Sequence, residues 1–195
     1  MMDECYFREV GKIEKYNAAK EEIESGKVKL GFLMNRVAFI DRDGVINEII
    51  YEPDGKLMSP ATIEQVKIMD KVKEGIAEIK KLGFKIIVVT NQPGVAFGYL
   101  RKEKLDEINK FLKFTLGIDE IYSCIHGPKE DCLCRKPRTG LIDMAKNDFN
   151  LDIKNSYMIG DNLNDIQFGI NAGVKKTFRV GIVREDILEL QHQKG

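Results

Sequence analysis

Residues 37–46, VAFIDRDGVI, join a short apolar run to two acidic residues that stand one residue apart. The apolar part has the composition of a buried strand, and it ends at Asp41 and Asp43, which Gly44 follows. A strand alternates its faces, so the two carboxylates can project to the same side. Neighbouring carboxylates repel each other unless a cation neutralises them or one is protonated. A hard divalent cation with oxygen ligands, Mg²⁺, resolves this conflict.

Outside this stretch, predicted strands and helices alternate along the chain. Strands are expected at residues 37–41, 84–91, 120–126, 156–161 and 176–181, and helices at residues 60–82, 101–116, 138–149 and 164–173. This alternation predicts an α/β fold, namely a Rossmann-like, three-layer parallel sheet with helices on both faces. Ligands bind beyond the carboxyl ends of the strands in such sheets. Polar residues follow four of these strands, so we expect the functional site at that end.

The length and composition favour one globular domain. The chain has 195 residues, 43% of them hydrophobic, and a formal net charge of zero. We expect the domain at residues 35–195 and an N-terminal helical extension at residues 1–34. The connections 47–59 and 91–101 are too short for a large cap domain.

The same totals bear on location and partners. The balanced charge argues against a nucleic acid partner. No apolar run has the length of a membrane span or the pattern of a signal peptide, so we expect a cytoplasmic protein with no membrane partner. A monomer is expected because no exposed apolar helix demands a partner.

Three cysteines and a histidine cluster in one short segment: Cys124, His126, Cys132 and Cys134. Three thiolates and one imidazole form a closed, four-ligand set that is typical of structural zinc. Free surface thiols are the alternative. A zinc-binding loop is therefore predicted at residues 124–134. Because Arg135 and Lys136 directly follow the last ligand, the metal would fix their position.

Four motifs carry a resemblance to a known family. They are DRDGVIN (41–47), VVTNQPGVAFGYL (88–100), CRKP (134–137) and MIGDNLNDI (158–166). Their order and spacing resemble those of the haloacid dehalogenase-like superfamily of phosphohydrolases. Within it, CIHGPKEDCLCRKP next to the TNQ motif is similar to the heptose 1,7-bisphosphate phosphatases and their relatives, the histidinol-phosphate phosphatases. The resemblance implies a phosphoric monoester hydrolase that acts on a phosphosugar, releasing the 7-phosphate of D-glycero-D-manno-heptose 1,7-bisphosphate.

The resemblance also implies catalytic roles. Asp41 would be the nucleophile, which forms an aspartyl-phosphate. Asp43 would act first as the acid and then as the base. Lys136 would place a positive charge against the transferring group, and Thr90 and the amide of Asn91 would bind phosphoryl oxygens.

The implied magnesium ligands are the carboxylates of Asp41 and Asp161 and the backbone carbonyl of Asp43. Asp165 would either hold Lys136 in place or contact a metal-bound water. The magnesium ion and the structural zinc ion are the two cofactors that we expect.

One position departs from the pattern of the bisphosphate phosphatases, which usually carry arginine where this chain has Phe97. Arg135 is then the first candidate to bind the substrate's second phosphate, and Arg42 and Arg138 are others. Histidinol-phosphate phosphatase and polynucleotide 3′-phosphatase remain alternative activities. A non-catalytic phosphosugar-binding module is the alternative from another class of protein.

Overall fold

The computed structural model describes residues 35–51 and 57–181. The predicted N-terminal extension, residues 1–34, lies outside the described residues, as do residues 52–56 and 182–195. In chain order the elements are β1 (Val37–Ile40), β2 (Ile50–Tyr51), β3 (Leu57–Met58), η1 (Ile63–Gln65), α2 (Val72–Lys81), β4 (Lys85–Asn91), α3 (Lys102–Leu116), β5 (Glu120–Cys124), α4 (Gly140–Asp148), η2 (Ile153–Asn155), β6 (Tyr157–Gly160), α5 (Leu163–Ala172) and β7 (Lys176–Arg179).

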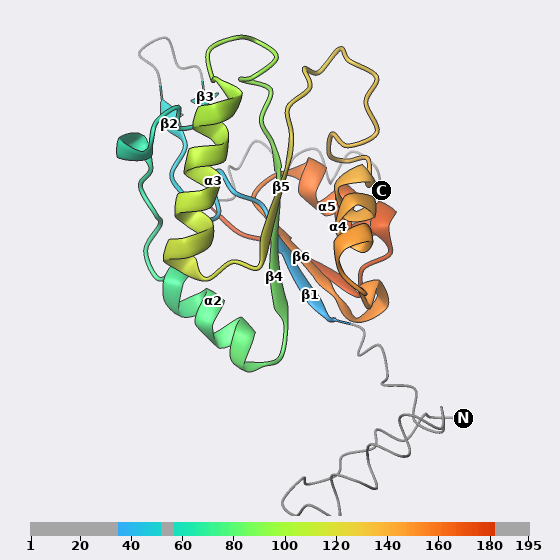
Figure 1. The fold of residues 1–195 in the computed structure, drawn as a ribbon. Coiled ribbons are helices and arrows are strands. Elements are labelled where there is room, and N and C mark those ends of the chain that lie inside the picture. The colour runs from blue at the N-terminus through green and yellow to red at the C-terminus, as the bar shows by residue number, and fades with distance from the viewer. Residues whose placement is uncertain (1–34, 52–56, 182–195) are drawn as a thin grey trace, which may run out of the picture. The chain divides into compact units, whose positions relative to one another are not determined.

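Five strands form one parallel sheet in the order β5-β4-β1-β6-β7 (Figure 1). In the central strand β1, Phe39 pairs with Ile87 of β4 on one side and with Met158 of β6 on the other. All four residues of β1 are buried, as expected for a parallel strand that is covered on both faces. The predicted α/β fold is confirmed.

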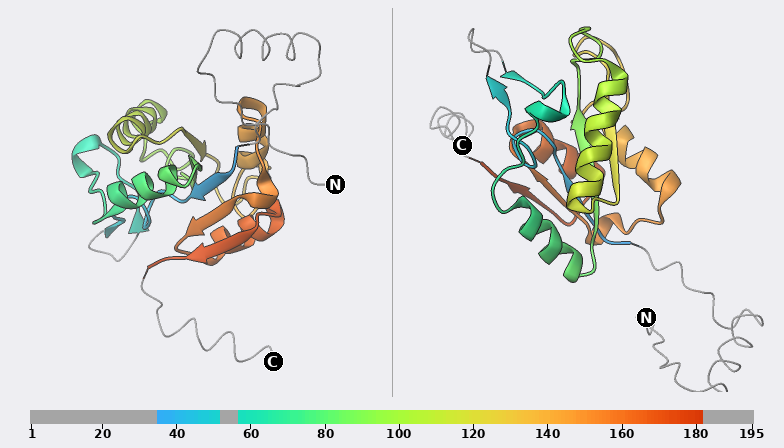
Figure 2. Two further views of the ribbon diagram at one scale, coloured as in Figure 1. Left: turned by 90° about the horizontal axis from the view of Figure 1, so that it is seen from below. Right: turned by 60° about the vertical axis from the view of Figure 1, so that its left-hand side comes forward.

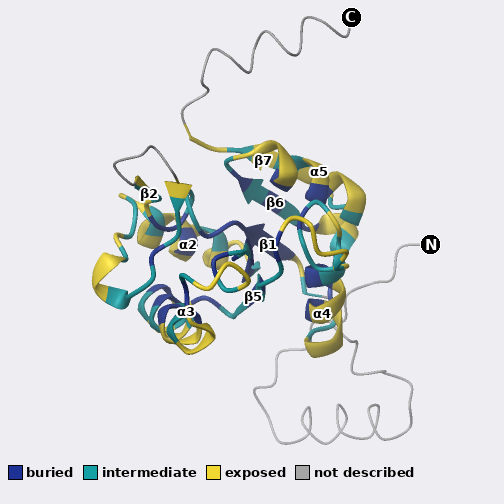
Figure 3. Ribbon diagram, turned by 90° about the horizontal axis from the view of Figure 1, so that it is seen from above, coloured by how far each residue is buried: buried dark blue, intermediate teal, exposed yellow. Residues whose placement is uncertain are grey.

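Helices cover both faces of this sheet, as the two views of Figure 2 show. On one face, Ile76 of α2 and Ile108 of α3 pack into a cluster with apolar side chains of β1 and β4. On the other face, Leu141 of α4 and Phe168 of α5 belong to a second buried cluster. Figure 3 shows that the central strand β1 and the inner sides of the helices are buried, whereas the edge strand β7 is intermediate or exposed. Burial of this apolar surface is the main stabilising contribution to the fold.

The longer loops lie at the carboxyl end of the sheet, the end at which we expect the functional site. In Figure 1 the loops that follow β4 and β5 both lie at the upper end, and the small β2–β3 pair lies at the upper left. Backbone hydrogen bonds extend the sheet slightly beyond its strands, since the amide of Asp41 donates to the carbonyl of Ile159 at 2.9 Å. The amide of Gln92 likewise donates to the carbonyl of Cys124 at 2.7 Å. The polar residues that follow these strands are therefore held in register.

The predicted helix at residues 60–82 is wrong in its first half. The α-helix begins only at Val72, and residues 63–65 form a single 3₁₀ turn. Between them, Ile68 forms an antiparallel β-bridge with Asn47, in the turn after β1. Pairing with a distant segment thus outweighs the helical spacing of the apolar residues.

The antiparallel pair β2–β3 has no counterpart among the predicted strands. Each strand has two residues, so this insertion is small, in agreement with the expected lack of a large cap. In the described part of the chain, no helix combines the length and the apolar character that crossing a bilayer would require.

Candidate active site and metal centres

A buried lysine joins two carboxylates at the carboxyl end of β1. Lys136 Nζ lies 2.7 Å from Oδ1 of Asp41, which directly follows the strand. The same Nζ lies 2.6 Å from Oδ1 of Asp165 in α5 and donates to the carbonyl of Val89 at 2.8 Å. All three charged side chains are at most 9% exposed. Asp165 therefore contacts Lys136 directly, which is one of the two arrangements predicted for it.

The charges of this cluster do not balance. Burial raises the pKa of Asp41 to about 7, and the carboxylate of Asp165 adds to the rise while Lys136 opposes it. Burial alone would lower the pKa of Lys136, but Asp41 and Asp165 raise it above its ordinary value. Burial and then Asp165 also raise the pKa of Asp161. Three carboxylates share one ammonium, so the cluster has excess negative charge that a divalent cation would neutralise.

The same carboxylates form a donor set for a hard cation. Asp41, Asp161 and Asp165 each offer an oxygen, and these oxygens lie within 4.8 Å of one another. Both oxygens of Asp165 accept bonds, one from Lys136 and the other from the amide of Asn162, whereas the contacts of Asp41 with Lys136 and the Arg42 amide are both to Oδ1. Asp41 and Asp161 are therefore better placed than Asp165 to bind a metal. Proteins typically hold Mg²⁺ by one or two carboxylates together with water and substrate oxygens. The residues present therefore fit Mg²⁺.

The turn after β1 makes space for one of these carboxylates. Gly44 has a φ of +84°, and a Cβ at this residue would lie 2.4 Å from Oδ2 of Asp161. Both the left-handed backbone and the close approach require a residue without a side chain.

The Asp43 side chain accepts hydrogen bonds from four residues, which we call the Asp43 donors: Arg42, Asn47, Ser59 and Gln92. Burial by itself raises the pKa of Asp43, but the charge and hydrogen bonds of Arg42, together with Ser59 and Asn47, hold it below its ordinary value. Because these donors engage the carboxylate, a metal contact by Asp43 is left to its backbone carbonyl.

Arg42 is not exposed to a ligand. Its guanidinium is completely buried between Asp43 and Asn109 of α3. The expectation that Arg42 is a candidate for the second phosphate is therefore wrong, because an interior carboxylate already neutralises its charge.

The end of β4 brings three polar side chains to the site. The hydroxyl of Thr90 is buried and accepts a bond from Gln92 Nε2 at 2.8 Å, which leaves its own proton to donate. The Asn91 side chain binds the backbone of Lys136 twice, accepting from its amide at 3.0 Å and donating to its carbonyl at 3.2 Å. Asn91 thus fixes the segment that carries Lys136, a contact that the sequence does not predict.

The remaining arginines differ in their partners. Arg138 pairs with Asp131 at 2.5 Å. Arg135 is half-buried and donates to the carbonyl of His126 at 3.3 Å, a neutral partner. Phe97, which is 60% exposed, stacks on Tyr99 with ring centroids 6.2 Å apart. Among the described residues, no carboxylate forms an ion pair with Arg135, so it is the candidate whose charge is available to a phosphate.

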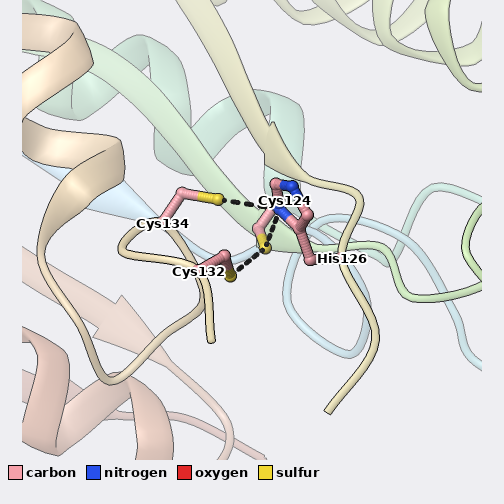
Figure 4. A group of neighbouring side chains, drawn as sticks. All are labelled: Cys124, His126, Cys132 and Cys134. Carbon is pink, nitrogen blue, oxygen red and sulfur yellow. Dashed lines mark hydrogen bonds between the residues drawn. The ribbon is translucent and has the colours of Figure 1, made fainter. Parts of the chain in front are cut away.

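The four predicted zinc ligands converge on one point (Figure 4). Cys124 Sγ lies 3.7 Å from Cys132 Sγ and 3.6 Å from His126 Nδ1, which lies 3.2 Å from Cys134 Sγ. A disulfide would need about 2.05 Å between sulfurs. Two sulfurs at about 2.3 Å from a tetrahedral zinc ion stand roughly 3.8 Å apart. The donor set and its spacing therefore fit zinc better than a disulfide.

Four residues of the site have no predicted role: Asn47, Ser59, Gln92 and Asn109. Gln92 directly follows the predicted strand that ends at Asn91, and this position is the one signal that pointed to it. Ser59 and Asn109 lie far from Asp43 in sequence, and no local pattern marks them.

Comparison with known proteins agrees with this site. A haloacid dehalogenase-like hydrolase family model matches residues 10–173. The D-glycero-alpha-D-manno-heptose-1,7-bisphosphate 7-phosphatase of Photorhabdus laumondii is 36% identical over 158 residues, which cover 74% of this chain and 82% of that protein. The D-glycero-beta-D-manno-heptose-1,7-bisphosphate 7-phosphatase of Haemophilus influenzae is 33% identical over 156 residues, which cover 73% and 79%.

Solved structures share the fold. A HAD-like phosphatase from Mesorhizobium loti has a TM-score of 0.64 and 27% identity, over 77% of this chain and 76% of that one. The D,D-heptose 1,7-bisphosphate phosphatase of B. bronchiseptica, complexed with magnesium and phosphate, has a TM-score of 0.63 and 24% identity, over 82% and 99%. The family model and the curated relatives both span most of the chain, which is therefore a haloacid dehalogenase-like hydrolase of the heptose bisphosphate phosphatase group, and thus a phosphoric monoester hydrolase.

Proposed function

We propose that this protein is a Mg²⁺-dependent phosphatase that removes the 7-phosphate of D-glycero-D-manno-heptose 1,7-bisphosphate. The observation that carries the proposal is the buried cluster of Asp41, Lys136 and Asp165 at the carboxyl end of the central strand. The names of the relatives support the phosphosugar substrate. They include both anomers, so the preferred anomer is a matter for experiment.

Magnesium would be held by Asp41 and Asp161, whose carboxylate oxygens lie close together, and by the backbone carbonyl of Asp43, which the family resemblance implies. When bound, Mg²⁺ shields the charge between the attacking carboxylate and the phosphoryl oxygens.

The chain's own residues would perform the reaction in two halves. Asp41 attacks phosphorus in line, and the bond from phosphorus to the leaving oxygen breaks, which gives an aspartyl-phosphate. Asp43 gives a proton to the leaving oxygen and later takes one from the attacking water. Lys136 and the Thr90 hydroxyl stabilise the charge that develops on the phosphoryl oxygens.

Zinc would have a structural role at Cys124, His126, Cys132 and Cys134, because four protein ligands leave no open position for chemistry. The metal would order the loop before Arg135, which would then meet the second phosphate.

The proposal is tested by phosphate release from a panel of substrates with Mg²⁺. The panel holds both anomers of heptose 1,7-bisphosphate, fructose 1,6-bisphosphate, histidinol phosphate and a 3′-phosphorylated oligonucleotide. We expect one heptose anomer to give the highest kcat/KM, about 10⁴ M⁻¹s⁻¹ or more. Preference for histidinol phosphate or the oligonucleotide would replace the heptose substrate by that alternative. Binding of a phosphosugar without phosphate release would favour the non-catalytic module and overturn the proposal.

Two glycine variants test the magnesium site. Gly44→Ala and Gly98→Ala both place a side chain at positive φ, +84° and +80°, and backbone strain alone should cost each variant about 1–2 kcal/mol of stability. Only Gly44→Ala pushes against Asp161, since nothing lies within 4 Å of a Cβ at Gly98. We expect Gly44→Ala alone to raise the half-saturating Mg²⁺ concentration, by about tenfold. Equal Mg²⁺ dependence in the two variants would contradict the assignment of Asp161.

Loss of one thiolate tests the zinc site. Cys132→Ser should lower zinc affinity by more than the roughly 10–100-fold that loss of a ligand's hydrogen-bond partner costs. Zinc content is measured by atomic emission after dialysis, with Cys5→Ser as the control, since Cys5 lies outside residues 124–134 in the sequence. Zinc retained at the wild-type ratio in Cys132→Ser would rule out Cys132 as a ligand, and wild-type protein that holds no zinc after dialysis would show that the cluster consists of free thiols.

A further inference from the structure

Arg42 is a buried guanidinium for which the proposed reaction gives no role. Its side chain is 0% exposed. Nε donates to Asp43 Oδ1 at 3.1 Å, and Nη2 donates to Asp43 Oδ2 at 3.2 Å. In many proteins a well-packed apolar pair is at least as stable as a buried ion pair, so stability alone does not account for Arg42.

The guanidinium is anchored to the body of the fold. Its Nη1 donates to Oδ1 of Asn109, in the middle of α3, at 3.1 Å. Asn109 Nδ2 in turn donates to the hydroxyl of Ser123 in β5 at 3.0 Å. A continuous series of hydrogen bonds thus runs from β5 through α3 to the Asp43 carboxylate. A helix and a strand are more rigid supports than the loop that carries Asp43 itself.

We infer that Arg42, held by Asn109, is a positioning residue that fixes the orientation of Asp43 for its proton transfers. This inference rests on the proposed function, in which Asp43 is the acid and the base. Proton transfer requires heavy atoms about 2.6–3.2 Å apart, so a carboxyl that turns away from the leaving oxygen loses its effect. Two N–H groups of one planar guanidinium, which bond both carboxyl oxygens, oppose such a turn.

The arrangement still allows Asp43 to exchange a proton. Asn47 and Arg42 Nε offer only N–H donors to Oδ1. Oδ2 also accepts N–H bonds, from Gln92 at 2.7 Å and from Arg42 Nη2 at 3.2 Å. Its third partner, the Ser59 hydroxyl at 2.7 Å, can accept as well as donate, so Oδ2 is the oxygen better suited to carry a proton.

Each proton transfer then balances. In the first half, the O–H bond at Oδ2 breaks as the leaving oxygen takes the proton and separates from phosphorus. In the second half, water gives a proton to Oδ2, its oxygen bonds to phosphorus, and the bond from phosphorus to Asp41 breaks.

The test compares two leaving groups in the purified full-length enzyme with Mg²⁺. An alkoxide needs a proton as it leaves, so heptose 1,7-bisphosphate depends on Asp43, whereas the nitrophenolate of p-nitrophenyl phosphate does not. We expect Asn109→Ala to lower kcat/KM about 10–100-fold for the bisphosphate and less than about threefold for p-nitrophenyl phosphate. Arg42→Lys, which keeps the charge but not the planar pair of donors, should show the same selective loss.

Two further variants separate positioning from a structural effect. Asn109→Asp keeps an acceptor for Arg42 and should recover part of the lost activity toward the bisphosphate. Asp106→Ala changes an exposed residue one turn earlier on α3 and should leave both activities unchanged. Equal losses with both substrates in Asn109→Ala, or no loss with either, would overturn the inference.

Asp43→Asn distinguishes failure of this inference from failure of the proposed function. It should show the same leaving-group selectivity with a larger loss. Asp43→Asn could lower kcat/KM more for the bisphosphate than for p-nitrophenyl phosphate while Asn109→Ala and Arg42→Lys do not. In that case Asp43 is the acid, but Arg42 does not position it. If Asp43→Asn lowers kcat/KM equally for the two substrates, the acid role in the proposed function is wrong, and the inference is overturned with it.

Discussion

Asp41→Asn is expected to abolish phosphate release while the fold remains intact. An uncharged amide is no nucleophile toward phosphorus, and removal of a nucleophile from other enzymes has cost about 10⁴–10⁶-fold in kcat. The variant should fold, because Lys136 keeps its pair with Asp165 and the asparagine oxygen still accepts from the amide of Arg42. Burial already disfavours the charge of Asp41, so losing that charge costs little stability. Phosphate release at saturating substrate and thermal unfolding measure the two effects.

Asp143→Asn is the matched control for this substitution. Asp143 is exposed in the first turn of α4, and among the described residues its ion-pair partner is Lys146 at the surface. Turnover of the Asp143→Asn variant should therefore equal that of the wild type. Turnover in Asp41→Asn above about one per cent of the wild-type rate would rule out Asp41 as the nucleophile. In the wild type, acid quenching during turnover should trap the phosphoryl group on the peptide that contains Asp41.

Lys136→Met is expected to reduce both activity and stability. The substitution removes the ammonium that lies 2.7 Å from Asp41 and 2.6 Å from Asp165, and it leaves two buried carboxylates facing each other. Breaking a buried ion pair by removing one partner typically costs about 3–5 kcal/mol. Urea unfolding at neutral pH without added Mg²⁺ should show a decrease of this size. Phosphate release with Mg²⁺ should fall to background, because the transferring group loses its cation.

A double variant separates the two effects of Lys136. Lys136→Met combined with Asp165→Asn removes one of the uncompensated charges, so stability should recover in part while activity stays lost. Lys136→Met with wild-type stability would show that the two carboxylates are protonated or solvated in the folded protein. Recovery of activity in the double variant would contradict the role of Lys136 in phosphoryl transfer.

The sequence predicts those parts of the site that depend on local pattern. An apolar strand followed by a polar residue places that residue at the carboxyl end of a parallel sheet, and Asp41 and Thr90 lie there for this reason. The zinc ligands are also local, since one short loop carries Cys132 and Cys134 and the strand before it carries Cys124. The convergence of these residues confirms the architecture, whereas their chemical roles stay predictions.

The parts that the sequence does not predict depend on long-range contacts. Asn109 lies on the side of α3 that faces the site, where its side chain accepts a hydrogen bond from Arg42. Nothing in the sequence around Asn109 distinguishes it from other polar helix residues, so this contact follows only from the packing of α3. Apolar spacing predicts a helix from residue 60, but the bridge from Ile68 to Asn47 delays its start. In both cases a partner far away in sequence decides the local structure.

The lysine at the centre of the acidic cluster bears on the order in which the proposed enzyme acquires its two metals. Lys136 already compensates part of the charge of Asp41 and Asp165, so the domain need not wait for magnesium in order to fold. At the other centre, the zinc ion itself neutralises the thiolates, and it would be acquired as the loop folds. Zinc would then remain bound to the folded protein, whereas magnesium would exchange with free Mg²⁺ in solution. At a low Mg²⁺ concentration the enzyme would remain folded but inactive, and its activity would return when the concentration rises.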